Sequence, residues 1–221
     1  RDFRLPNENA SARDHTENSN MGETVYPVEV QADFIAKITR ARPVQALAEL
    51  IWNGLDADAS SVTVTFGYDE LGSLSSITVS DNGKGLSHKN APAFFGRLGG
   101  SWKQPGMRTE GGRFLHGQEG RGRFKAFALG RLAEWDVTYQ KDSEFLSFAI
   151  SIDENNFREV HVADETPATV RRSGVTVTIR ELHKDFRSLS SAQGLQELTE
   201  SFALYLSDYK NVAIVIDGHK L

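Results

Sequence analysis

Four oxygen-bearing side chains recur between residues 44 and 56 at a spacing that places them on one side of a helix. At about 3.6 residues per turn, Gln45, Glu49, Asn53 and Asp56 fall within roughly 80° of one another. The stripe contains no lysine or arginine, whereas an ordinary solvated helix face, the alternative here, mixes charges of both signs. Carboxylate and amide oxygens without neighbouring cations suit a hydrated divalent cation.

A second group, Asp81-Asn82-Gly83-Lys84-Gly85, follows an alternating strand over residues 76–80. Asn-Gly after a strand is typical of a type I′ hairpin turn, which is the alternative interpretation. Residues 86–100 contain no returning strand, and residues 91–95 favour a short helical turn closed by Gly96. The glycines at 83 and 85 would instead let the backbone approach a flat ligand closely.

The third group is a glycine-rich loop, with Gly117, Gly120 and Gly122 leading into residues 123–129. The pattern predicts a loop that feeds a helix N-terminus, where unpaired amides and the helix dipole favour a phosphate. It is neither a Walker A loop nor the Gly-x-Gly-x-x-Gly dinucleotide fingerprint. Plain loop flexibility is the alternative.

In this order the three groups resemble the GHKL ATPase superfamily of DNA gyrase, the ninety-kilodalton heat-shock chaperones, histidine kinases, and the MutL and MORC proteins. The resemblance covers about residues 30–182. The segment around Glu49, Asn53 and Asp56 is most similar to MutL and MORC, whereas the one from Gly117 is similar to the chaperones and also to MORC. The subfamily is therefore left open.

The resemblance implies an α+β two-layer sandwich, in which a mixed, mostly antiparallel sheet is covered on one face by helices (the Bergerat ATP-binding fold). It implies that Asp81 accepts a hydrogen bond from the adenine amino group and that Gly85 lies under the base. Asn53 would supply an oxygen to Mg²⁺. Glu49 would position and polarise the water that attacks the γ-phosphate, and Asp56 would help to orient the base-side network.

Backbone amides around Gly120 and Gly122 would hold the triphosphate, with charge stabilisation supplying most of the rate. Relatives carry a mobile lid, here about residues 86–120, and Ser101-Trp102-Lys103 resembles its Ser-x-Lys portion. Lys103 is therefore expected to contact phosphate. The glycine pairs at 99–100 and 111–112 are candidate hinges.

Residues 97–131 carry a local excess of positive charge in an otherwise acidic chain. A lid over a triphosphate needs positive charge, and an exposed basic loop that contacts nucleic acid is the alternative. The basic residues are Arg97, Lys103, Arg108, Arg113, Arg121, Arg123, Lys125 and Arg131, against Glu110 and Glu119.

One position departs from the pattern. Relatives present a Gly-Thr pair whose hydroxyl joins the adenine-binding water network, and the matching place here reads Ser173-Gly174-Val175-Thr176. A shift of one residue in a strand turns the Thr176 side chain to the opposite face. Either Ser173 or a water substitutes, or adenine recognition is looser.

Composition fits one substantial core: 221 residues, 39% hydrophobic, with a net charge of −5 that gives no overall attraction to nucleic acid. The chain has no cysteine, which excludes disulfides and is compatible with the cytoplasm. No apolar run approaches membrane-spanning length. The six histidines show no metal-ligand spacing.

We expect a polar N-terminal arm over residues 1–22, an ATPase domain over 23–209, and the start of a following, truncated domain over 210–221. Helices are predicted at 31–40, 44–56 and 190–209. Strands are predicted at 62–66, 75–80, 134–140, 145–152, 157–162, 174–182 and 211–216, with a turn at 141–143.

The expected function is Mg²⁺-dependent ATP binding and slow hydrolysis, used as a conformational switch in a larger machine that acts on DNA or protein. Self-association would follow ATP binding through domains outside the chain. A nucleotide-gated interaction module without turnover is one alternative. A histidine-kinase catalytic domain is another, but Glu49 at the water-activating position and the absence of a preceding phosphoacceptor helix speak against it.

Overall fold

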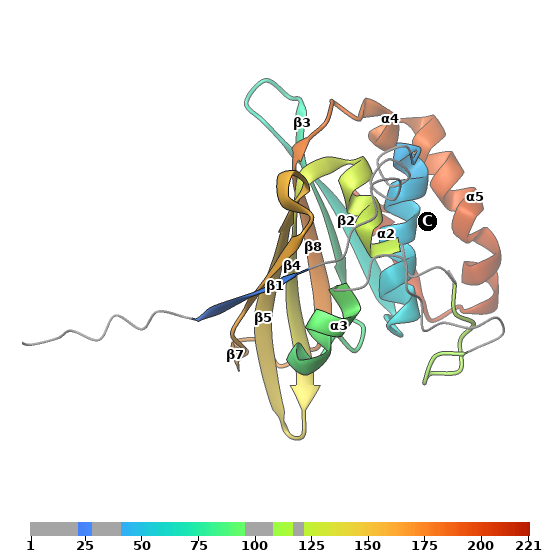
Figure 1. The fold of residues 1–221 in the computed structure, drawn as a ribbon. Helices are drawn as coiled ribbons and strands as arrows, with labels where there is room; N and C mark the ends of the chain where they lie inside the picture. Colours follow the sequence, from blue (N-terminus) through green and yellow to red (C-terminus); the bar gives the residue numbers. More distant parts are fainter. Residues whose placement is uncertain (1–21, 28–40, 96–107, 117–121) are drawn as a thin grey trace, which may run out of the picture.

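The computed structural model describes residues 22–27, 41–95, 108–116 and 122–221, which form a ten-stranded sheet with helices on one face (Figure 1). Most strand pairs are antiparallel, and β9 pairs with β2 in parallel. The predicted α+β class is confirmed. The predicted arm at 1–22 and the predicted helix at 31–40 lie almost entirely outside the described residues.

The strand order is β1-β6-β5-β4-β8-β3-β2-β9-β10, with β7 paired to β5. The strands are β1 (Glu23–Pro27), β2 (Ser61–Tyr68), β3 (Leu74–Asp81), β4 (Gly130–Lys141), β5 (Glu144–Asp153), β6 (Glu159–Ala163), β7 (Thr166–Pro167), β8 (Gly174–Leu182), β9 (Ala213–Ile216) and β10 (His219–Lys220).

The helical elements are α2 (Pro43–Asp56), α3 (Ala91–Phe95), α4 (Arg187–Ser190) and α5 (Ala192–Asp208), with the 3₁₀ turns η1 (His88–Asn90), η2 (Gly122–Ala128) and η3 (Glu154–Asn156). Within the described ranges, no helix combines the length and apolar character needed to cross a membrane.

Helix α2 forms the centre of the helical layer. Pro43 occupies its first turn, where a missing N–H costs nothing. Leu47, Ile51 and Leu55 are almost completely buried, and the helix packs against η2, α5 and the sheet. Because an apolar stripe on one side anchors the helix, its polar stripe is held in one orientation.

The central strands bury alternate residues under the helices. Ile77 and Val79 of β3 face the core together with Val177 of β8 and Trp135 of β4. Since side chains alternate along a strand, Asp81 at the end of β3 shares this helix-covered face. The other face carries mainly hydroxyls and charged groups.

Two predictions need correction. Residues 210–221 were expected to begin another domain, but β9 hydrogen-bonds along β2 and β10 pairs with β9, so they complete this sheet. The helix expected after Gly122 is the 3₁₀ turn η2 rather than an α-helix. Its few, tightly wound residues align fewer peptide dipoles, which weakens the dipole part of the phosphate argument.

Candidate functional site

Helix α2 and the start of η2 meet at the polar stripe. A Cβ placed on Gly122 would lie 2.9 Å from Glu49 Oε2 and 3.2 Å from Asn53 Oδ1. A larger residue there would displace the end of the Glu49 side chain. The structure thus brings Gly122, the described member of the third group, to the first group predicted from the sequence.

Asp81 reaches the same helix from the sheet. A Cβ on Gly54 would lie 2.8 Å from Asp81 Cβ and 3.2 Å from Asp81 Oδ2. Gly54 directly follows Asn53, so the carboxylate of Asp81 and the amide of Asn53 occupy neighbouring positions along α2. Residues of the three sequence-distant groups therefore converge on one helix.

The segment after Asp81 is a turn built onto the end of α2 rather than a β-hairpin. Asn82 Oδ1 accepts hydrogen bonds from the Ser60 and Ser61 amides at 2.9 and 2.8 Å, and the Lys84 amide donates to the Ala57 carbonyl at 2.9 Å. The chain then enters η1 and α3, which confirms the short helical turn predicted at 91–95.

The carboxylate of Asp81 is desolvated. Burial raises its pKa to about 6, although hydrogen bonds from the backbone of Gly83 and Val175 partly offset this. The Gly83 amide donates to Asp81 Oδ1 at 2.7 Å. Among the described residues, Asp81 forms no ion pair, and this desolvated carboxylate is an acceptor suited to a neutral N–H donor.

Gly85 has a packing role. Its φ is +69°, and a Cβ there would lie 2.3 Å from the Thr138 carbonyl oxygen in β4. A left-handed backbone against another strand requires glycine whether or not a base lies nearby. The expectation that Gly85 lies under adenine therefore stays a prediction.

Thr176 does not join this group. It pairs with Ser80 across β8 and β3, and the two hydroxyls are 2.8 Å apart. Ser80 and Asp81 are consecutive in β3, so their side chains point to opposite faces. Strand β8 instead contributes a hydrogen bond from the Val175 backbone to Asp81. A pattern of residue types does not reveal a backbone contact.

Asp56 lies at the last turn of α2 and holds the segment 108–116. Its Oδ1 accepts a hydrogen bond from the His116 amide at 2.8 Å, and the His116 ring stacks on Trp52 at 4.0 Å and 11°. Trp52 also contacts Phe202 and Tyr205 of α5. The stack on His116 was not foreseen.

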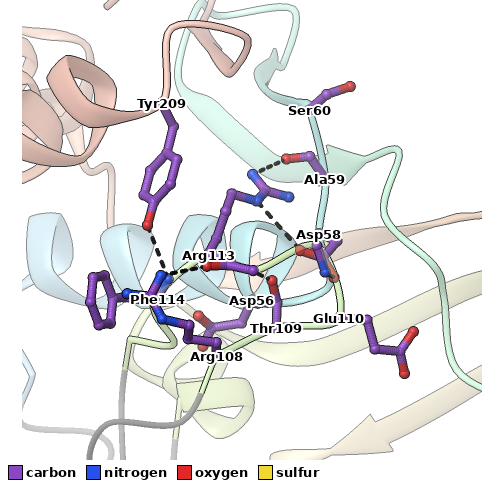
Figure 2. A network of polar contacts seen from close by, with 12 residues as sticks. Asp56, Asp58, Ala59, Ser60, Arg108, Thr109, Glu110, Arg113, Phe114 and Tyr209 are labelled. Carbon is purple, nitrogen blue, oxygen red and sulfur yellow. Dashed lines mark hydrogen bonds and ion pairs between the residues drawn. The ribbon is translucent and has the colours of Figure 1, made fainter.

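The basic segment is only partly described, and one of its members is not available for phosphate or DNA. Arg113 is 8% exposed and pairs with Asp58 (Figure 2). Arg108 lies over the Phe114 ring at 3.8 Å. Lys103, Gly117 and Gly120 lie outside the described residues, so their predicted phosphate contacts stay predictions.

The few protein oxygens beside Gly122 suit a cation that is bound mainly by phosphate oxygens and waters. Across the described part of the chain, no three histidine, aspartate or glutamate side chains gather as a metal site. Mg²⁺ commonly takes one or two protein oxygens and fills its octahedron with phosphate oxygens and waters. Asn53 beside Glu49 matches that requirement.

Comparison with known proteins agrees with this geometry. Residues 41–183, more than half of the chain, match the family described as histidine kinase-, DNA gyrase B-, and HSP90-like ATPase. The chain is also 33% identical over 86 residues to a putative type II restriction enzyme, HgiDII, from Herpetosiphon aurantiacus. That match covers 39% of this chain and 13% of the relative.

The matched range begins just before α2 and ends just after β8, so it contains Glu49, Asn53, Asp81 and Gly122. The chain belongs to the family of histidine kinase-, DNA gyrase B- and HSP90-like ATPases.

Proposed function

We propose that this domain binds ATP with Mg²⁺ beside the polar face of α2 and hydrolyses it slowly. The observation that carries the proposal is the close approach of Gly122 to Glu49 and Asn53, together with that of Asp81 to Gly54 on the same helix. The desolvated carboxylate of Asp81 thus lies against Gly54, and the backbone of Gly122 lies against Glu49 and Asn53 on the same helix.

Each side chain then has a distinct part. Asp81 accepts a hydrogen bond from the adenine amino group, because an enclosed carboxylate gains most from an N–H donor. Asn53 contributes an oxygen to the cation that accompanies the phosphates. Glu49 orients the attacking water, and Gly122 permits close approach of the backbone to the phosphates.

Hydrolysis is favoured over phosphotransfer because Glu49 lies beside Gly122, where the phosphate end is proposed. A carboxylate there promotes attack by water, which a kinase must suppress. We propose that turnover is slow and that ATP acts as a switch for conformation and self-association. A nucleotide-gated module without turnover is the second candidate, and Glu49 distinguishes the two.

The similarity to a putative restriction enzyme supports DNA as the client of the larger machine. Because only 13% of that protein is matched, its activity is not transferred to this chain. The family contains kinases, gyrases and chaperones, so a protein client is the alternative.

The test combines binding and turnover. Calorimetry with a non-hydrolysable ATP analogue and Mg²⁺ should detect binding to the wild type and to Glu49→Ala, whereas phosphate release should occur only with the wild type. Gln45→Ala is the matched control, because Gln45 is exposed on the same helix and the atoms nearest Gly122 belong to Glu49 and Asn53 instead. Equal phosphate release from wild type and Glu49→Ala would favour the module, and a lack of binding would refute the nucleotide site.

A further inference from the structure

The segment 108–116 forms a tight turn that is held against the end of α2 (Figure 2). Within the turn, the Thr109 amide donates to the Arg113 carbonyl at 2.8 Å and the Gly112 amide donates to the Thr109 carbonyl at 2.9 Å. Arg108 and Phe114 form an isolated antiparallel bridge at its base. The turn is thus a small, internally bonded unit with its own shape.

Asp58 supplies the attachment on the α2 side. It has φ +63°, a left-handed conformation that usually selects glycine after a helix. Its carboxylate accepts hydrogen bonds from the Gly111 amide at 3.0 Å and from Arg113 Nε at 3.4 Å. Aspartate is among the few residues besides glycine that adopt this conformation readily, and here its carboxylate makes the attachment.

The charge of Asp58 is stabilised by this attachment. Burial alone would raise its pKa, but hydrogen bonds from Thr109 and Gly111 and the charge of Arg113 together hold the pKa below its ordinary value. The carboxylate is therefore ionised across the physiological range.

Arg113 is the matching half. Its side chain is buried, and Nη1 donates to the Ala59 carbonyl at 2.8 Å while Nε faces Asp58. A buried guanidinium that loses its carboxylate is left uncompensated, so the two residues depend on each other. Together they fix the turn to residues 58 and 59, directly after α2.

The chain leaving this turn is fastened again at His116, by Asp56 and Trp52. At Gly122 it resumes against Glu49 and Asn53. Both flanks of the glycine-rich segment are therefore fixed on the same helix, one at its last turn and one a turn earlier. The Phe114 amide also donates to Tyr209 Oη at 3.1 Å, which ties the turn to the end of α5.

From these contacts we infer that Asp58 and Arg113 are positioning residues for the triphosphate end of the nucleotide site, which Glu49, Asn53 and Gly122 mark. They fix the turn that leads to His116, one of the two described points at which this part of the chain meets α2, and Gly122 is the other. The inference rests on the proposed function. It predicts that loss of the pair weakens binding of the phosphates while leaving recognition of the base nearly intact.

The test compares three ligands: a non-hydrolysable ATP analogue with Mg²⁺, ADP with Mg²⁺, and adenosine. Calorimetry is performed on the wild type, Asp58→Asn, Asp58→Gly and Arg113→Gln, with thermal unfolding of each. Glu110→Gln is the matched control, because it removes one negative charge from the exposed side of the same turn. Asp58→Gly suits the left-handed backbone at the helix end, which offsets part of the cost of leaving Arg113 without its carboxylate, and thermal unfolding should show that the variant is folded.

We expect the three pair variants to weaken the ATP analogue about tenfold, whereas adenosine affinity changes less than about twofold. Glu110→Gln should behave as the wild type. Equal losses for all three ligands, or unchanged affinity for the ATP analogue in Asp58→Gly, would overturn the positioning role alone. A folded wild type that binds none of the ligands would overturn the proposed function as well.

Discussion

Replacing Asp81 by asparagine should stabilise the domain while weakening its nucleotide site. The carboxyl pKa of about 6, against an ordinary value of 3.8, corresponds to roughly 3 kcal/mol by which folding disfavours the ionised group. Asparagine has nearly the same shape, keeps an oxygen for the Gly83 amide and carries no charge to desolvate, which outweighs the one acceptor oxygen that it lacks beside Gly83 and Val175. The variant should therefore be more stable than the wild type at pH 8.

The pH dependence gives the sharper test. Because the pKa is raised on folding, the folded state binds more protons than the unfolded state between about pH 4 and pH 6. Wild-type stability from this group is fully present below pH 4 and is lost as the pH rises through 6. Between pH 5 and pH 8 the loss amounts to about 1.4 kcal/mol, and Asp81→Asn should lack it.

Urea unfolding of both proteins at intervals from pH 5 to pH 8 measures this difference directly, since other groups titrate alike in both and cancel. Asp81→Asn should therefore be more stable than the wild type but should bind nucleotide more weakly. The variant should bind an ATP analogue about ten- to a hundredfold more weakly, because a charge-assisted hydrogen bond is lost. Wild-type affinity should decline below pH 6, as protonation removes the charged acceptor. Stability curves that run parallel with pH, or full affinity in the variant, would refute the reasoning.

Two further predictions concern residues that the structure places inside and outside the site. Gly122→Ala adds a Cβ within 2.9 Å of Glu49 Oε2 and should weaken binding of the ATP analogue more than that of adenosine while far-ultraviolet circular dichroism stays unchanged; equal affinity for both ligands would contradict the packing at Gly122. Thr176→Val loses only a hydroxyl bonded to Ser80 on the other face of the sheet, so its affinity for ATP should stay within about twofold of wild type by calorimetry, and a large loss would mean that this hydroxyl does reach the base.

Much of the fold could be predicted from local patterns. The helix predicted at residues 44–56 corresponds to α2, and the helical turn predicted at residues 91–95 corresponds to α3. Strands β4, β5 and β8 were located by alternation, because each has one buried face. These predictions depend only on neighbouring residues, because the spacing of apolar residues within one helix or strand shows which of its faces is buried.

Contacts between segments that lie far apart in the chain were harder to predict from the sequence. The sequence placed Arg113 in a basic lid segment, but a residue's charge does not reveal whether it will be buried in an ion pair. Residues 210–221 were assigned to another domain, because a strand pattern does not name its partner and β9 pairs with β2 far earlier in the chain. The contribution of Val175 comes from its backbone, which every residue type shares.

By itself, the sequence determined which oxygens and glycines this protein carries, in which order, and which of them share a helix face. Only the tertiary structure decided that Asp81 packs on Gly54, that Gly122 meets Glu49 and Asn53, and that the Thr176 hydroxyl pairs with Ser80. The physical reason is that residue type and local period fix the chemistry and the direction of a side chain within its own element. Its solvation and its neighbours depend on which elements pack together.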